Sequence, residues 1–246
     1  MALLEPTEQP PVPRSHATAS EARADRAEIK RNFRPEGCSE HLRLVSTADE
    51  SAPLWDAAER FVYDEYRAVG YCEESPKGWV EEAEPFRHGS TLHVMLDGEQ
   101  VVGTIRTMFG PYDELPIGRF GHDIPVPSGR LAEVGSLAVS RDLRGLGVAN
   151  ELHRAAVQQV IASRVPAFCM LVEPWSIEFF RDVYGLPLVQ TAPPRDYMGS
   201  LTVPAIVDIS EMLESFSRER VGMYHWITEG LDPSLWADGS IPIVLD

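Results

Sequence analysis

Two glycines near a predicted helix are the residues of this 246-residue chain whose spacing suits the binding of phosphate. Gly145 and Gly147 follow an apolar segment that ends at Val139, and a helical pattern then runs to Ser163. Glycine lets the backbone approach a ligand closely because it has no Cβ atom. The first N–H groups of a helix are unpaired and lie at the positive end of its dipole. From the turn alone, a pyrophosphate site and a plain glycine-rich turn are equally good interpretations.

The residues around the turn exclude two common nucleotide-binding motifs. A P-loop requires Lys and then Ser or Thr after its last glycine, but Val148 and Ala149 stand there. The dinucleotide fingerprint requires a third glycine, and Asn150 occupies its position. Any phosphate here would therefore be bound by backbone N–H groups, and Arg141 or Arg144 could add a charge-assisted hydrogen bond.

Strands and helices on both sides must hold this turn in place. Apolar residues recur every three or four positions over residues 55–69, which predicts an amphipathic helix. The segments 91–96 and 101–108 are apolar and β-branched, and the Asp97-Gly98 pair between them predicts a hairpin. The nearly continuous apolar run 166–172 predicts a strand that is buried on both faces.

This mixture of strands and helices predicts a layered α/β (α+β) domain with a mixed sheet. Residues 1–40 are rich in proline and poor in apolar side chains, so we expect a disordered or mobile N-terminal arm. We expect residues 41–210 to form the domain. Residues 211–246 should add a C-terminal helix and an aromatic tail that packs on it.

Composition narrows the function. The formal charge of −16 argues against nucleic acid, whose phosphates would be repelled. No Cys or His pair has metal-ligand spacing, so we expect no metal. The sequence has no apolar run of about 20 residues and no apolar signal-peptide core, so we expect a cytoplasmic protein.

The residues around the turn resemble the acyl-CoA-binding motif of the GNAT superfamily, R/Q-x-x-G-x-G/A. Arg144, Gly147 and Ala149 stand at its positions. The strand 167–172 and the short helix ending at Gly185 are similar to the second GNAT motif. The resemblance implies a mixed, mostly antiparallel central sheet flanked by helices. In that fold the sheet is splayed between the two strands that hold the thioester.

Looser motifs resemble one GNAT branch, which contains long-chain N-acyl amino acid synthases and acyl-homoserine-lactone synthases. They lie at residues 101–106, 115–117, 132–139 and 197–205, whereas the opening helix at 59–65 departs from the branch pattern. The branch implies transfer of a medium- or long-chain acyl group from acyl-CoA or an acyl carrier protein to the amine of an amino acid or similar small molecule. An acetyl-CoA-dependent N-acetyltransferase and a non-catalytic acyl-CoA-binding protein are the alternatives.

The resemblance also assigns the donor site. Backbone groups of Leu137 and Val139 should bond the pantetheine, and N–H groups of residues 144–149 should hold the pyrophosphate. The predicted donor residues are Leu137, Ala138, Val139, Arg144, Gly145, Leu146, Gly147, Val148 and Ala149.

Acyl transfer to an amine requires a base, and a proton for the leaving thiolate. Glu133 is the best candidate base, and the alternative is a buried carboxylate paired with Arg106. Arg106 itself could bind the carboxylate of the acceptor. Tyr184 is a candidate acid, although core packing is an equally good interpretation.

Two further regions could contact the substrates. Trp79 and Glu84 match a Trp and acidic residues that help to hold the acceptor in lactone synthases, and the alternative is a solvated acidic loop. The apolar loop 120–127 could line an acyl channel or simply pack over the sheet.

Overall fold

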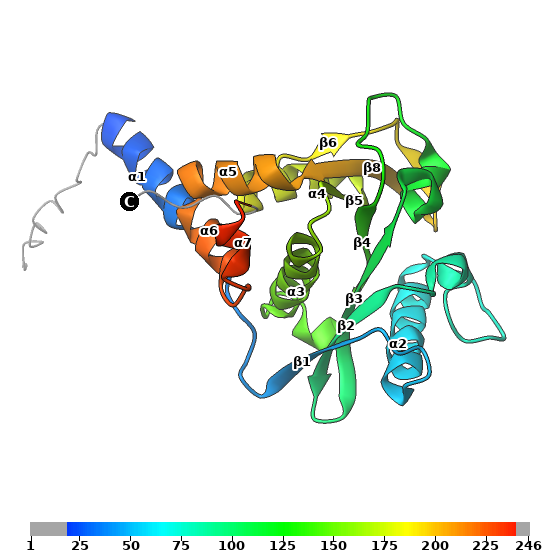
Figure 1. Ribbon diagram of the computed structural model, residues 1–246. Helices are drawn as coiled ribbons and strands as arrows, with labels where there is room; N and C mark the ends of the chain where they lie inside the picture. Colours follow the sequence, from blue (N-terminus) through cyan, green and yellow to red (C-terminus); the bar gives the residue numbers. More distant parts are fainter. Residues whose placement is uncertain (1–18, 240–246) are drawn as a thin grey trace, which may run out of the picture.

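One sheet runs through the part of the chain that the computed structural model describes, residues 19–239, with side chains from residue 26 onward (Figure 1). Residues 1–18 of the expected arm and 240–246 of the expected tail lie outside this range. The strands are β1 (Leu42–Thr47), β2 (Thr91–Asp97), β3 (Gln100–Gly110), β4 (Leu131–Val139), β5 (Ala167–Val172), β6 (Val189–Gln190), β7 (Arg195–Tyr197) and β8 (Ser200–Asp208). The helices are α1 (Ala19–Asn32), α2 (Pro53–Val69), α3 (Val148–Ala162), α4 (Pro174–Phe179), α5 (Ile209–Glu219), α6 (Val221–Thr228) and α7 (Ser234–Ala237).

The described strands are hydrogen-bonded in the order β1-β2-β3-β4-β5-β8-β6, and β7 also pairs with β8. β4 and β5 are parallel, and the other described pairs are antiparallel. The mixed, mostly antiparallel sheet flanked by helices is therefore confirmed. The hairpin is confirmed too, because Asp97 pairs with Gln100 across a two-residue turn in which Gly98 has φ 58°.

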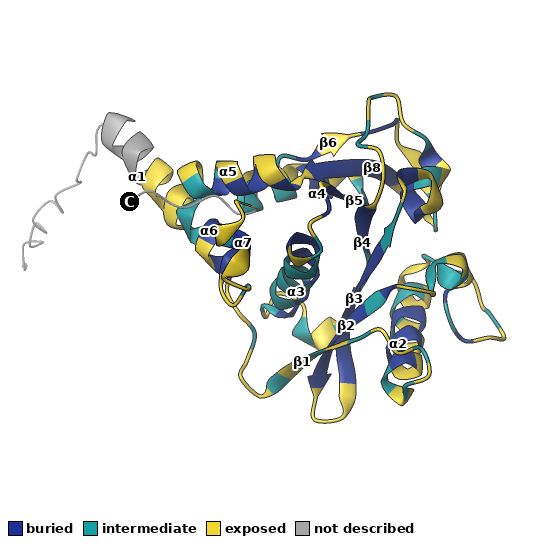
Figure 2. Ribbon diagram, in the orientation of Figure 1, coloured by how far each residue is buried: buried dark blue, intermediate teal, exposed yellow. Residues whose placement is uncertain are grey.

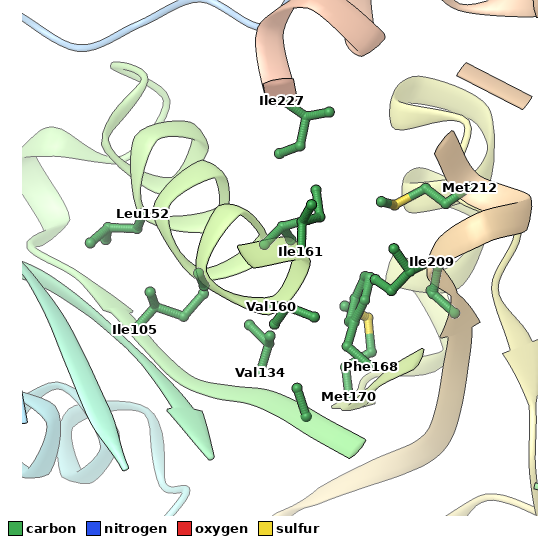
Figure 3. Close-up of a cluster of buried hydrophobic side chains, with 14 of the residues drawn as sticks. Ile105, Val134, Leu152, Val160, Ile161, Phe168, Met170, Ile209, Met212 and Ile227 are labelled. Carbon is green, nitrogen blue, oxygen red and sulfur yellow. The ribbon is translucent and has the colours of Figure 1, made fainter. Parts of the chain in front are cut away.

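Helices cover both faces of the sheet. α2 and α3 lie on opposite faces of β3 (Figure 1). Side chains alternate along a strand, so Val134 of β4 and Phe168 and Met170 of β5 point into the core under α3 (Figure 3). α5 and α6 close this core at the other side of α3, where Met212 and Ile227 pack into it (Figure 3). Burial is accordingly greatest in the central strands (Figure 2).

Local sequence explains why the two covering helices start and stop where they do. Pro53 occupies the first turn of α2, where its missing N–H is not needed. Gly70 ends the helix in the left-handed conformation at φ 85°. α3 follows Gly147, whose φ is 80°. No helix among residues 19–239 is long and apolar enough to cross a membrane.

The structure describes residues 19–41 of the segment before β1, which include the second half of the expected N-terminal arm. Residues 19–32 form α1, and the following residues pack across α6 and the start of α3. A Cβ atom added to Gly222 of α6 would lie 2.4 Å from the Phe33 carbonyl oxygen. The Asn150 side-chain amide of α3 donates to the Glu36 carbonyl oxygen at 2.8 Å. Residues 33–39 form an N-terminal strap, which contacts the domain through backbone carbonyl groups and through the Phe33 side chain, whose ring lies 6.5 Å from that of Tyr184.

Candidate active site

The parallel strands β4 and β5 part after two residue pairs. Ala132 pairs with Phe168 and Glu133 with Cys169, and no further pair follows between these strands. A cavity of about 320 Å³ lies where they separate. Its walls include residues 134–137 of β4 and 170–172 of β5. The described strands are therefore splayed at the place that the sequence predicted.

Elements from both faces of the sheet complete the cavity. α2 and the following loop contribute aromatic and acidic residues, whereas α3 and α4 close the opposite side. The other lining residues are Tyr66, Tyr71, Val80, Glu82, Ala83, Phe86, Ile105, Met108, Pro116, Glu133, His153, Glu173, Trp175, Ser176, Phe180, Tyr197, Met198, Ser200 and Thr202.

Glu133 lies at the closed end of the cavity, where β4 and β5 are still paired, and its side chain is only 2% exposed. Its Oε2 atom accepts a hydrogen bond of 2.8 Å from the backbone N–H of Ile117. Burial raises the pKa of the carboxyl to about 8, although that N–H and the charge of Arg119 act in the opposite direction. A buried carboxyl with such a pKa is suited to accept a proton near neutral pH.

A bulge in β4 lies beside this carboxyl. Thr104 of β3 pairs with Ala138 and Arg106 with Gly135, so β4 contains one extra residue between these pairs. Ser136 has φ 51° there, and its carbonyl oxygen accepts a hydrogen bond from the Thr104 hydroxyl at 3.3 Å. A bulge interrupts the ladder of backbone hydrogen bonds and redirects the strand. Leu137, the predicted pantetheine ligand that directly follows it, lines the cavity.

The glycine turn adopts left-handed backbone conformations, with φ 81° at Gly145 and 80° at Gly147. A Cβ atom added to Gly145 would meet nothing within 4 Å. At Gly147 it would lie 2.3 Å from the Gly37 carbonyl oxygen of the N-terminal strap. The glycine at 147 is therefore required by the packing of the strap as well as by the turn, and a substitution there would disturb more than donor binding.

The arginine of the turn already has partners. The Arg144 Nε atom donates to the Val139 carbonyl oxygen at 3.1 Å, and its Nη2 atom bonds Glu65 at 2.7 Å. Donor contacts at the Val139 carbonyl would share that oxygen with Arg144. Of the other predicted donor residues, Leu146 is exposed at the tip of the turn, whereas Ala138 and Val148 are buried in the core.

Arg106 does not pair with Glu133. Its Nη2 atom donates a hydrogen bond to Glu59 Oε1 of α2 at 2.8 Å, and Arg87 Nη2 forms an ion pair with Glu59 Oε2 at the same distance. The Nε and Nη1 atoms of Arg106 are buried without a partner among the described residues. The alternative interpretation of Glu133, a carboxylate paired with Arg106, is therefore not what the structure has: Arg106 belongs to a Glu59–Arg106–Arg87 cluster under α2. A direct contact of Arg106 with the acceptor stays a prediction.

Three other predicted residues lie outside the cavity lining. Tyr184 donates its hydroxyl to Asn150 at 2.6 Å, which ties it to the start of α3. The Trp79 ring stacks on the Arg87 guanidinium at 4.6 Å, and Glu84 bonds Lys77 at 2.6 Å. Their roles in the reaction stay predictions, while their neighbours Val80, Glu82 and Ala83 line the cavity.

A sequence model of one protein family, N-acyl amino acid synthase FeeM, matches residues 57–207 of the chain. This match spans more than half of the chain and includes β4 and β5, the two strands between which the cavity lies. The chain belongs to this family. Comparison with curated proteins finds no significant sequence match.

Solved structures agree with the family fold. The structure of FeeM, an N-acyl amino acid synthase from uncultured soil microbes, is 20% identical to this family member and covers 74% of it. The match spans 98% of the FeeM chain, with a TM-score of 0.54. BjaI, a CoA-dependent acyl-homoserine lactone synthase with bound MTA, is 16% identical, with 83% and 92% coverage and a TM-score of 0.57. TofI in a ternary complex with an inhibitor and MTA is 17% identical, with 78% and 99% coverage and a TM-score of 0.52.

In this member of the N-acyl amino acid synthase family, sequence reasoning missed three tyrosines of the cavity. Tyr66 and Tyr71 have rings in edge-to-face contact at 5.4 Å, and burial raises the pKa of both phenols. Tyr197 stacks against Phe120 of the loop expected to line an acyl channel. The aromatic residues of α2 were identified from the sequence as one helix face, but nothing in the sequence showed which of them would meet the splayed strands.

A second, smaller cavity of about 40 Å³ lies on the α3 face of the sheet. Val134, His153, Met170 and Phe180 line both cavities, so they form the wall between the two. The rest of its lining is apolar or aromatic and comes from α3, α5, α6, β5 and the turn after α4. Among residues 26–239, no cluster of three metal-ligating side chains occurs.

Proposed function

We propose that this protein is an N-acyltransferase that moves an acyl group from a thioester of coenzyme A or of an acyl carrier protein to the amine of an amino acid or similar small molecule. The observation that carries the proposal is Glu133, a buried carboxyl with a raised pKa at the closed end of a cavity between two splayed strands. Membership of the N-acyl amino acid synthase family supports the same reaction.

The thioester donor fits the glycine turn at the start of α3. The unpaired N–H groups at the start of α3, together with the open space at Gly145, suit a pyrophosphate or phosphate group. The pantetheine arm would then run along the edge of β4 past Leu137, which lines the cavity. This path brings a thioester from the turn toward Glu133.

The chemistry needs one proton to move from nitrogen to sulfur. The Glu133 carboxylate accepts the proton that the amine nitrogen loses as it bonds to the carbonyl carbon of the thioester. The carbon–sulfur bond then breaks, and the protonated Glu133 can return the proton to the thiolate. Its pKa of about 8 is close to that of a thiol, about 8.5, so this transfer is nearly balanced. A separate acid such as Tyr184 is not required by this scheme.

The smaller cavity offers an apolar site for the acyl chain of the donor. We propose that it passes between β4 and β5 toward the smaller cavity on the α3 face, rather than along the loop 120–127. Phe120 of that loop is only 3% exposed and packs on Tyr197, whereas Phe180 and His153 line both cavities, so a side-chain movement there would join them. This supports a medium or long chain over acetyl.

A donor and acceptor screen tests the proposal. Acetyl, octanoyl and palmitoyl thioesters of coenzyme A and of an acyl carrier protein would be incubated with a pool of amino acids, and thiol release and product masses would be recorded. We expect amide products with octanoyl or palmitoyl donors. Amide formation with acetyl alone would establish the acetyltransferase instead, and thioester binding without turnover would establish the non-catalytic binding protein.

A further inference from the structure

The charged side chains that line the larger cavity are acidic. Glu82, Glu133 and Glu173 line it, and within the described part of the chain no lysine or arginine does. His153 also lines the cavity. Burial lowers the pKa of its imidazole, so it adds no positive charge near neutral pH. Glu133, with its pKa of about 8, is mostly uncharged near neutral pH, so the negative charge that attracts cations to the cavity comes from Glu82 and Glu173.

Glu173 is fixed in position without being neutralised. Its Oε1 atom accepts a hydrogen bond from the Tyr71 hydroxyl at 3.0 Å, and its Oε2 atom accepts one from Trp175 Nε1 at 2.6 Å. Both donors are neutral, and no described cation forms an ion pair with this carboxylate. By contrast, Glu59 and Glu65 each pair with arginine. A carboxylate that is fixed in position by neutral donors keeps its negative charge uncompensated, so it can bind a cation.

Glu133 and Glu173 both line the larger cavity, Glu133 where β4 and β5 are still paired and Glu173 just after the end of β5. Glu133 is paired with Cys169, and side chains alternate along a strand, so Cys169, Leu171 and Glu173 share a face of the sheet. The hydrogen bond from Tyr71, which follows α2, places Glu173 on the α2 face. Glu173 is four positions after Cys169, which corresponds to roughly 13 Å between their Cα atoms along an extended strand.

Glu133 also lacks a partner that a substrate could supply. Ile117 donates to its Oε2 atom, but no described residue donates to Oε1. Glu133 is only 2% exposed, and it lines the cavity. This oxygen is left to accept a hydrogen bond from a group that enters the cavity. An amine at this end of the larger cavity would donate a hydrogen bond to Oε1 of Glu133.

We propose that Glu173 binds a second cationic group on the amine acceptor, so that the acceptors are linear diamines or basic amino acids. This inference rests on the proposed function, because it places the reacting amine at Glu133. Glu173 is four positions beyond the residue that pairs with Glu133, so the acceptor needs a chain of several atoms between its two nitrogens. The ring of Trp175, which is 68% exposed at the open end, adds a π face that favours a cation.

Matched acceptors test the assignment. With one acyl donor, kcat/KM would be compared for 1,5-diaminopentane against 1-aminopentane and for lysine against norleucine. We expect the doubly charged acceptor to be preferred by roughly 10- to 100-fold, the range of a hydrogen bond to a charged group. Glu173→Gln should bring both ratios close to one, mainly through KM, because the amide is uncharged while Trp175 can still donate to its oxygen and the Tyr71 hydroxyl can accept from its N–H. Glu178→Gln, at an exposed position of α4, should leave both ratios unchanged.

A binding measurement separates this inference from the reaction. Titration of 1,5-diaminopentane into the protein without any donor should give binding that Glu173→Gln weakens at least 10-fold and Glu178→Gln does not. That result in a protein that acylates no amine would leave the cation site in place and remove the proposed function. Acyl transfer that makes no distinction between matched acceptors, or equal diamine binding by both variants, would overturn the cation site and leave the function intact.

Discussion

Replacement of Glu133 by Gln should make the stability of the protein less dependent on pH. The carboxyl has a pKa of about 8 in the folded protein, against 4.5 as its ordinary value. Between these values the folded state binds one proton more than the unfolded state, so stability falls as pH rises through this window. Below pH 4.5 both states are protonated, and above pH 8 the full cost of burying the charge is present.

The size of this effect follows from the pKa difference. One pKa unit corresponds to about 1.4 kcal/mol, so the complete window corresponds to a loss of at most about 5 kcal/mol. Gln has the same shape and cannot ionise. The stability of Glu133→Gln relative to the parent should therefore increase from pH 5 to pH 9 by several kcal/mol.

Urea unfolding at a series of pH values measures this difference. Glu178→Gln is the matched control, because it removes an exposed carboxyl and should follow the parent at every pH. The same buffers allow an activity test with an aromatic amine as acceptor, which is already neutral in this range. Its kcat/KM should rise with pH toward a plateau above 8. Parallel stability curves for the parent and Glu133→Gln would refute the reasoning from burial.

Three other predictions concern the donor turn, the acyl chain and the core. Gly145→Val should weaken coenzyme A binding in calorimetry while the protein stays folded, whereas Gly230→Val, at a similar φ of 86° in equally open space, should leave the affinity unchanged. The kcat/KM for an octanoyl donor should exceed that for acetyl, because each buried methylene adds about 0.8 kcal/mol; a ratio below one would exclude the apolar chain site. Arg106→Ala should cost about 3–5 kcal/mol in unfolding experiments by breaking a buried ion pair, whereas loss of the exposed Arg218–Glu214 pair through Arg218→Ala should cost less than about 1 kcal/mol.

Local patterns made the sheet and its two covering helices predictable. The Asp97-Gly98 pair, the apolar run of β5 and the spacing of apolar residues in α2 each depend on neighbours within a few positions. The splay between β4 and β5 came from the family resemblance, because no local rule states where two parallel strands separate. The bulge at Ser136 was missed, since serine has no general preference for φ near 51°.

Contacts between distant segments could not be predicted. Glu59 and Arg106 are 47 positions apart, and the sequence offered Glu133 or the carboxylate of the acceptor as the partner of Arg106. Tyr71 and Glu173 are 102 positions apart, and their hydrogen bond forms only because α2 is packed over the splayed end of the sheet. The strap at Gly37 contacts Gly147 through backbone atoms, which no side-chain pattern records.

The most direct test of the account is a comparison of thiol release with amide formation in the parent and in Glu133→Gln. An octanoyl thioester would be mixed with lysine, and free thiol and N-acylated product would be measured in the same samples. The account predicts equal amounts of thiol and amide in the parent. It also predicts a rate that is roughly 10²–10⁴-fold lower in Glu133→Gln, the range for a positioned base, with donor affinity retained. Thiol release without amide, or equal rates for the two proteins across pH 6 to 9, would contradict it.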